Sequence, residues 1–161
     1  MIEFDYKLDY KHLNFRKKEN RSLYRIGRGE QGVLLVRPYT NLICREWRFK
    51  TVSEAKKSAK KIFDMYMGFR AIKDFIGMDM CRKFLEMGFT RARRYANHRD
   101  GKKYDSKGNV KPQEPDALTC EKAKSARVFK RYRDLVTHDP IYIDMRKQWR
   151  ELEEAYANSN T

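Results

Sequence analysis

Residues 51–71 have the sequence TVSEAKKSAKKIFDMYMGFRA and carry the clearest helical pattern in the chain. Their apolar side chains recur at intervals that place them on one face of a helix. Those side chains are Ala55, Ala59, Ile62, Phe63, Tyr66 and Met67. Thr51 and Glu54 have the spacing of a capping box, in which each side chain satisfies a free backbone N–H of the first turn. The stretch therefore predicts a helix over about 52–71.

The chain after this helix predicts four more helices. Their expected spans are about 78–87, 90–97, 117–136 and 140 onward. Gly88 is placed to end the first of these four, and Thr90 to cap the second. Asp139 and Pro140 form an N-cap followed by a proline at the first helical position, which predicts where the last helix starts.

Residues 1–50 predict β-structure instead. Phe4, Tyr6, Leu8 and Tyr10 alternate with charged residues, which is the period of a half-buried strand. The apolar runs 23–26 and 33–36 flank a glycine-rich segment and predict a hairpin, and residues 47–49 predict a short third strand.

These patterns together predict an α+β fold, with a small N-terminal β-hairpin or meander layer packed on about five α-helices. We expect a single domain over 1–161, because this length suits one ordinary domain. Within it we expect a β-rich part at 1–50, a helical part at 51–97, a basic loop at 98–115 and a helical pair at 116–161.

Charge is the strongest compositional feature. The chain has 37 Lys and Arg residues against 22 Asp and Glu residues, a net charge of +15. The excess is uneven: residues 90–112 hold eight basic and two acidic side chains, residues 121–133 hold six basic and one acidic, and the balance reverses from 137 onward. A localised excess of positive charge attracts anions, and nucleic acid is the partner we expect first.

Composition also predicts a location. No window approaches the length of a membrane span, and the acidic start lacks the pattern of a signal peptide, so no membrane partner is expected. Cys44, Cys81 and Cys120 are far apart and have no metal-binding or disulfide spacing, which is typical of reduced thiols. We therefore expect a cytoplasmic protein, without a metal site or cofactor.

The candidate nucleic-acid site lies in two basic segments. Arginine grips phosphate through two parallel hydrogen bonds, and tyrosine offers a face on which a base can stack. The first segment contributes Arg91, Arg93, Arg94, Asn97, Arg99, Lys102, Lys103 and Tyr104, and the second contributes Lys124, Arg127, Lys130 and Arg131. Contacts mainly to phosphate predict binding that weakens steeply with salt and depends little on base sequence. The alternative is that these are solvated charged faces that bind no ligand.

A second candidate site is a glycine-rich loop formed by Gly27, Arg28, Gly29 and Gly32. Its G-x-G-x-x-G spacing matches dinucleotide sites, but those sites open a helix, whereas here an apolar run follows. His98-Arg99-Asp100 matches the H-R-D of kinases, yet the chain lacks D-F-G and is too short for that fold. A hairpin whose glycines permit positive φ remains the simplest interpretation, with a phosphate-contacting loop as the alternative.

Two further alternatives concern the basic segments. Gly88 between two expected helices invites comparison with a helix-turn-helix, although Arg94 and Asn97 would then stand where the second helix needs apolar residues. Pro115-Asp116 followed by Glu121-Lys122 is a faint echo of a nuclease signature, with a spacer that is too short. A nuclease is therefore the least unlikely activity, and we expect no catalytic residues.

Several strings resemble a family of small basic proteins of unknown function found in bacteria and large tailed phages. They are WRFKT at 47–51, FIGMDM at 75–80, RRYANH at 93–98 and KKYD at 102–105. The resemblance covers about residues 4–149 and implies that the whole chain is one such domain. It also implies a bacterial or a phage gene, and a phage-encoded protein would be located in the cytoplasm of the host. It implies no activity.

Three functional hypotheses follow. The first is a nucleic-acid-binding protein that contacts the phosphate backbone of DNA or RNA. The second is a modulator that binds an acidic host or partner protein. The third is a protein or enzyme that binds a nucleotide or another phosphorylated small molecule. The sequence predicts no oligomeric state.

Overall fold

The structure of the chain is a computed structural model that describes residues 2–159. Within this range it contains helices and no β-strand, and only Tyr104 and Val110 form an isolated β-bridge. The predicted α+β fold with an N-terminal β-hairpin layer is therefore wrong, and the described fold is helical. The helices are η1 (Tyr10–His12), α1 (Lys18–Arg21), α2 (Tyr39–Cys44), α3 (Val52–Ala71), α4 (Phe75–Asn97), α5 (Glu121–Thr137) and α6 (Pro140–Ser159).

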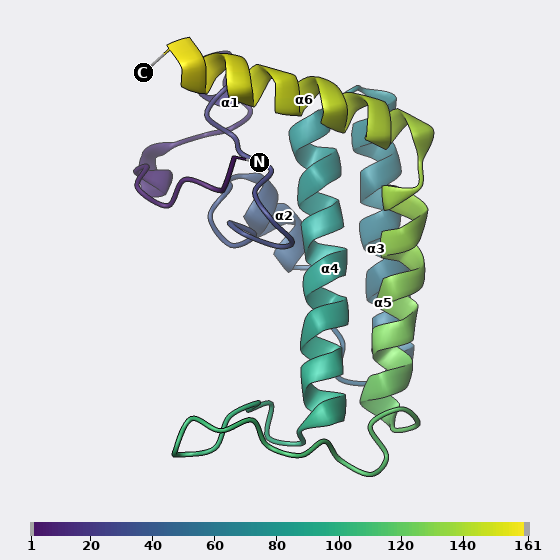
Figure 1. Cartoon of the computed structure of the whole chain (residues 1–161). Coiled ribbons are helices and arrows are strands. Elements are labelled where there is room, and N and C mark those ends of the chain that lie inside the picture. The colour runs from purple at the N-terminus through teal and green to yellow at the C-terminus, as the bar shows by residue number, and fades with distance from the viewer. Residues whose placement is uncertain (1, 160–161) are drawn as a thin grey trace.

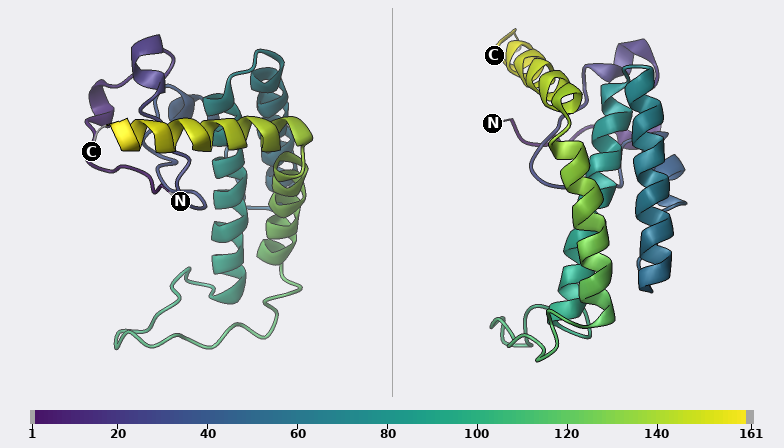
Figure 2. Two further views of the ribbon diagram at one scale, coloured as in Figure 1. Left: turned by 45° about the horizontal axis from the view of Figure 1, so that its top comes forward. Right: turned by 90° about the vertical axis from the view of Figure 1, so that its right-hand side faces the viewer.

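Three long helices, α3, α4 and α5, run side by side, and α6 crosses one end of them (Figure 1). Figure 2 shows the same arrangement from two other sides, with the segment between α4 and α5 at the opposite end from α6. Residues 2–50 pack beside α4, on the side away from α5 (Figure 1). None of the described helices is both long and apolar enough to cross a membrane.

Helix α3 confirms the prediction for residues 52–71. The Thr51 side chain accepts a hydrogen bond of 3.1 Å from the Glu54 backbone N–H, which is one half of the expected capping box. Ala55, Ala59, Ile62 and Tyr66 are buried as expected, and Phe63 packs against them, whereas Met67 is 42% exposed. Met67 falls at the edge of the apolar face.

Helix α4 is one continuous helix where the sequence predicted two. Gly88 was expected to end a helix but lies in the interior of α4. The ring of Phe129 in α5 packs directly over it. A Cβ atom at position 88 would lie 2.4 Å from Cδ1 of Phe129. The glycine permits close packing of α4 on α5. Because α4 has no turn at Gly88, the helix-turn-helix interpretation is wrong.

The N-terminal segment forms turns because its aromatic side chains are buried by distant residues. Phe4, Tyr10, Phe15 and Tyr24 make successive ring contacts that end on Trp149 of α6. Hydrogen bonds between side chains and the backbone take the place of the backbone hydrogen bonds that would pair two strands, and Thr40 gives an example.

Thr40 illustrates this replacement. Its hydroxyl donates to the Val33 carbonyl at 2.8 Å and accepts from the Val36 N–H at 3.0 Å, so the predicted strand 33–36 is held as turns. The predicted third strand at 47–49 is also irregular, since the Arg48 N–H bonds to the Ser58 side chain of α3.

The C-terminal helices follow the sequence more closely. Helix α6 begins at Pro140 as predicted, and Asp139 accepts a hydrogen bond of 3.1 Å from the Ile141 N–H. Asp139 also binds Tyr66 at 2.5 Å and Arg70 at 2.8 Å, which joins this corner to α3. Helix α5 begins four residues later than predicted, because residues 115–119 form turns, and the segment 98–115 is a loop as expected.

Candidate anion-binding site

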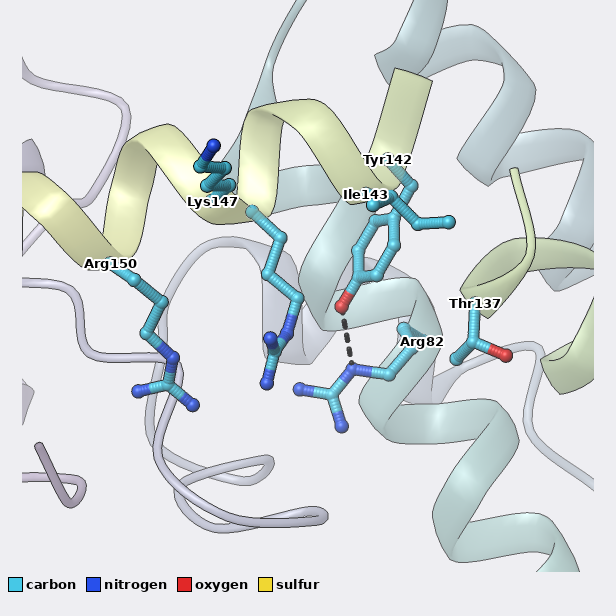
Figure 3. A pocket seen from close by; sticks show the side chains of 7 residues that line it. Arg82, Thr137, Tyr142, Ile143, Lys147 and Arg150 are labelled. Atoms are coloured by element: carbon cyan, nitrogen blue, oxygen red, sulfur yellow. Dashed lines mark hydrogen bonds between the residues drawn. The ribbon is translucent and has the colours of Figure 1, made fainter. Parts of the chain in front are cut away.

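A pocket of about 510 Å³ lies where α6 crosses α4 and the end of α5. Its lining combines four cationic side chains with two that carry a hydroxyl and one isoleucine. They are Arg82, Thr137, Tyr142, Ile143, Arg146, Lys147 and Arg150, and we call this site the arginine pocket (Figure 3).

The geometry of helix α6 creates most of this lining. Tyr142, Arg146 and Arg150 follow one another at intervals of four residues, so they form a stripe along one side of the helix. Arg150 and Arg82 reach into the same space beneath α6, whereas the ammonium group of Lys147 points the other way (Figure 3). Two segments more than 60 residues apart in the sequence thus supply the arginines.

Arg82 forms the innermost part of the pocket and is only 8% exposed. Its Nε donates to Asp79 at 2.9 Å and to the Tyr142 hydroxyl at 3.1 Å, and its Nη1 donates to the Gly29 carbonyl at 2.5 Å. Its Nη2 makes no hydrogen bond to any residue from 2 to 159. That nitrogen is available to a ligand.

Asp79 holds Arg82 from within the core. It is fully buried and accepts hydrogen bonds from Tyr142, at 2.6 Å, and from Tyr24. Burial alone would raise the pKa of Asp79, but the charges of Arg82 and Lys83 and the hydrogen bonds outweigh burial and hold the pKa at about 2. The carboxylate is therefore ionised at neutral pH and compensates one cation of the pocket.

Arg150 is fixed in a similar way. Its Nη1 donates at 3.1 Å to Glu153, which is 1% exposed, and its Nη2 donates at 2.7 Å to the Gly27 carbonyl. Glu153 also accepts a hydrogen bond of 2.8 Å from the Ile26 N–H. Glu153 therefore compensates a second cation and ties α6 to the N-terminal segment.

The other two cations have no such compensation. Within residues 2–159, neither Arg146 nor Lys147 forms a hydrogen bond or an ion pair through its side chain. Three arginine charges thus face the pocket, and two buried carboxylates, Asp79 and Glu153, balance two of them. Like charges held close together repel, and a bound anion would relieve that repulsion.

Lys83 follows Arg82 in α4 and lies in the core. It is fully buried and donates to the Gln31 carbonyl at 2.7 Å and to the Arg25 carbonyl at 3.3 Å. Burial lowers the pKa of Lys83 to about 7, with help from Arg82 and Arg150 and against the opposite effect of Asp79 and Glu153.

The predicted glycine-rich loop borders this site. It contacts the arginines through its backbone carbonyl groups. Gly27, Gly29 and Gly32 have φ values of 68°, 52° and 76°, so the expected positive φ is present. Gly27 and Gly29 accept from arginines, as described above, and the Arg28 side chain pairs with Glu3 at 2.5 Å. The loop orients cations in this arrangement.

Helix α4 divides its predicted nucleic-acid residues between two directions. Arg93 and Asn97 are one turn apart and share a hydrogen bond of 2.5 Å. Arg91 lies nearly opposite Arg93, and Arg94 lies between them, because successive residues turn by about 100° around a helix. Arg91 lines a separate hollow with Tyr6 and Arg28 of the N-terminal segment.

The loop residues lie at the end of the bundle opposite α6 (Figure 1). Arg99 lies 3.5 Å from Glu114 and 3.7 Å from Asp116, and Lys103 stacks over the ring of Tyr104 at 5.6 Å. Lys102 is exposed and its side chain makes no ion pair within residues 2–159.

Helix α5 directs its basic residues away from the core formed by Ala123, Ala126 and Phe129. Lys130 pairs with Asp134 at 3.0 Å, and Arg127 donates to the Leu118 carbonyl at 3.0 Å. Lys124 and Arg131 are exposed on the face of α5 opposite Phe129, which packs on α4. Among the predicted residues within 2–159, side-chain contacts join Arg93 with Asn97 and Lys103 with Tyr104, and none joins a predicted residue of α5 to one of α4 or of the loop.

Sequence reasoning missed the arginine pocket. It assigned Arg146 and Arg150 to an acidic C-terminal region and did not single out Asp79 or Arg82. Two signals were present: an aspartate and an arginine three residues apart among the apolar residues of 75–85, and the tyrosine–arginine–arginine stripe of the last helix. The residues from 2 to 159 contain no cluster of three or more metal-binding side chains.

The fold and the pocket define a helical protein with an arginine-lined cavity between its last helix and α4. The chain belongs to the family described as Domain of unknown function (DUF4385), which it matches over residues 5–152. This range includes every residue that lines the arginine pocket. No curated protein and no solved structure matches the chain.

Proposed function

We propose that this protein binds nucleic acid through phosphate groups, with the arginine pocket as its strongest phosphate contact. The observation that carries the proposal is the convergence of Arg82, Arg146 and Arg150 on one cavity with fewer carboxylates than cations. Guanidinium groups match phosphate geometry better than any other side chain.

Basic side chains outside the pocket would support this binding at longer range. Eight of the ten predicted basic contacts carry no ion pair within residues 2–159: Arg91, Arg93, Arg94, Lys102, Lys103, Lys124, Arg127 and Arg131. With a net charge of +15 they create a positive field on several sides of the molecule. A cytoplasmic location in a bacterium, or in the host of a tailed phage, would give the protein access to both DNA and RNA.

Fluorescence anisotropy with a labelled duplex, a labelled single strand and an RNA hairpin tests the proposal. If the pocket and the basic side chains outside it neutralise three phosphates of the duplex in all, the affinity falls about 40-fold between roughly 50 and 200 mM salt. We expect such a loss for at least one of the three ligands. Dissociation constants weaker than about 10 μM for all three at the lower salt concentration would overturn the proposal.

A second candidate function is the binding of a phosphorylated small molecule. It is favoured by the size of the pocket, about 510 Å³, which lies within the usual range for small-molecule sites. Thermal unfolding with a panel of nucleotides separates the two functions, since a small-molecule site predicts stabilisation by a nucleotide and no affinity for the three labelled ligands.

A further inference from the structure

We infer that the arginine pocket takes a terminal phosphate monoester, such as the 5′-phosphate of a nucleic-acid end or of a free nucleotide, and not a phosphate inside a continuous strand. The inference that the phosphate belongs to a nucleic-acid end rests on the proposed function. The inference that the pocket binds a phosphate monoester does not.

Depth restricts which phosphate can reach the inner arginine. Arg82 is 8% exposed and lies beneath α6, with Gly29 of the N-terminal loop bonded to its Nη1. A phosphate that contacts the free Nη2 must therefore enter the pocket. A phosphate within a strand carries a sugar on two of its oxygens and cannot enter end-on, whereas a terminal phosphate carries one sugar and presents three free oxygens.

Charge also favours the monoester. Arg146 leaves one positive charge of the pocket uncompensated, and the unpaired Lys147 adds a second on the adjoining surface of α6. A phosphate monoester carries a charge of about −1.5 to −2 at pH 7, because its second pKa is about 6. A phosphate within a strand carries a single negative charge, so the monoester neutralises the excess more completely.

Two of the three arginines are already ordered for binding. Asp79 and the Gly29 carbonyl hold Arg82, and Glu153 and the Gly27 carbonyl hold Arg150. A ligand then gains these contacts without ordering both side chains, which favours affinity. Arg146 has no hydrogen bond within residues 2–159, so it can turn toward the phosphate and can be replaced without breaking the fold network.

The test compares two single-stranded oligonucleotides of one sequence, labelled at the 3′ end and carrying either a 5′-phosphate or a 5′-hydroxyl. We expect the phosphorylated strand to bind about tenfold more tightly, which corresponds to about 1.4 kcal/mol. In Arg146→Ala this ratio falls to about threefold or less, because the variant loses one arginine–phosphate contact. A nucleoside monophosphate competes with the phosphorylated strand, and the unphosphorylated nucleoside does not.

Lys56→Ala is the matched control, since it also removes one positive charge. Lys56 is exposed near the start of α3, where the Val52 N–H bonds to Glu121 at the start of α5, and it is therefore far from the pocket at the end of α5. We expect Lys56→Ala to keep the wild-type ratio.

The outcomes separate the two proposals. Equal affinity for both strands, together with no competition by the monophosphate, overturns the inference and leaves nucleic-acid binding in place. Binding of the monophosphate without affinity for either strand supports the inference and overturns nucleic-acid binding. A preference for the 5′-phosphate that Arg146→Ala leaves unchanged places the phosphate elsewhere and also overturns the inference.

Discussion

The hydroxyl of Tyr142 in α6 donates a hydrogen bond of 2.6 Å to the buried carboxylate of Asp79 in α4. The same oxygen accepts a hydrogen bond of 3.1 Å from Nε of Arg82. One tyrosine thus connects the crossing helix to the bundle and fixes the innermost arginine of the pocket.

Tyr142→Phe removes this hydroxyl and keeps the ring. We expect the free energy of unfolding to fall by about 1–3 kcal/mol, because a charged buried acceptor loses a partner. Urea unfolding followed by circular dichroism measures the change. Tyr104→Phe is the control: Tyr104 is 54% exposed, and a change within about 0.5 kcal/mol is expected there. Equal stability of the two variants would contradict the role assigned to Tyr142.

Asp79→Asn leaves Arg82 buried without its ionised partner. We expect a loss of about 3–5 kcal/mol in the free energy of unfolding, the usual cost of breaking a buried ion pair. The control is Asp64→Asn, which breaks the exposed pair with Lys60 and should cost less than about 1 kcal/mol. A loss at Asp79 no larger than at Asp64 would show that the buried pair contributes little.

Lys83 makes stability depend on pH. Its pKa is about 7 in the folded chain and higher in the unfolded chain, so the unfolded chain binds more protons above pH 7 and stability rises with pH. Between pH 6.5 and 8.5 this group contributes a gain of about 2 kcal/mol. Lys83→Met removes the gain, and the difference between wild type and variant isolates it from other titrating groups. Parallel pH profiles for the two proteins would contradict the shifted pKa.

Gly88→Ala and Gly68→Ala are a matched pair in two long helices. At position 88 the added Cβ would lie 2.4 Å from Phe129, whereas at position 68 nothing lies within 4 Å. Crowding costs about 1–3 kcal/mol and outweighs the helix-forming advantage of alanine at position 88, whereas position 68 gains about 0.5–1 kcal/mol. Thermal unfolding compares them, and stabilisation by both substitutions would contradict the close packing of α4 on α5.

Local signals made parts of this fold predictable. The start of α3 follows from Thr51 and Glu54, and the start of α6 follows from Asp139 and Pro140, because a helix cap is formed by residues near it in sequence. Gly88 led to a wrong prediction because a distant residue requires a glycine there. The ring of Phe129 in α5, 41 residues further along the chain, occupies the space that a Cβ atom would fill.

The N-terminal segment shows a different limit. The alternation of Phe4, Tyr6, Leu8 and Tyr10 has the period of a strand, but Phe4 and Tyr10 stack on one another and are buried by later parts of the chain. Tertiary packing overrides local pattern in such segments. The arginine pocket was equally hidden, because it exists only once α6 lies across α4.

The central claim is that phosphate binds at the arginine pocket, and charge reversal at Arg146 tests it most directly. The measurement is the affinity for a 5′-phosphorylated single strand at low salt, in Arg146→Glu and in Lys56→Glu, which change the net charge equally. We predict a loss of about 30-fold for Arg146→Glu, against about threefold or less for Lys56→Glu. Equal losses in the two variants would show that overall charge, and not the pocket, accounts for binding.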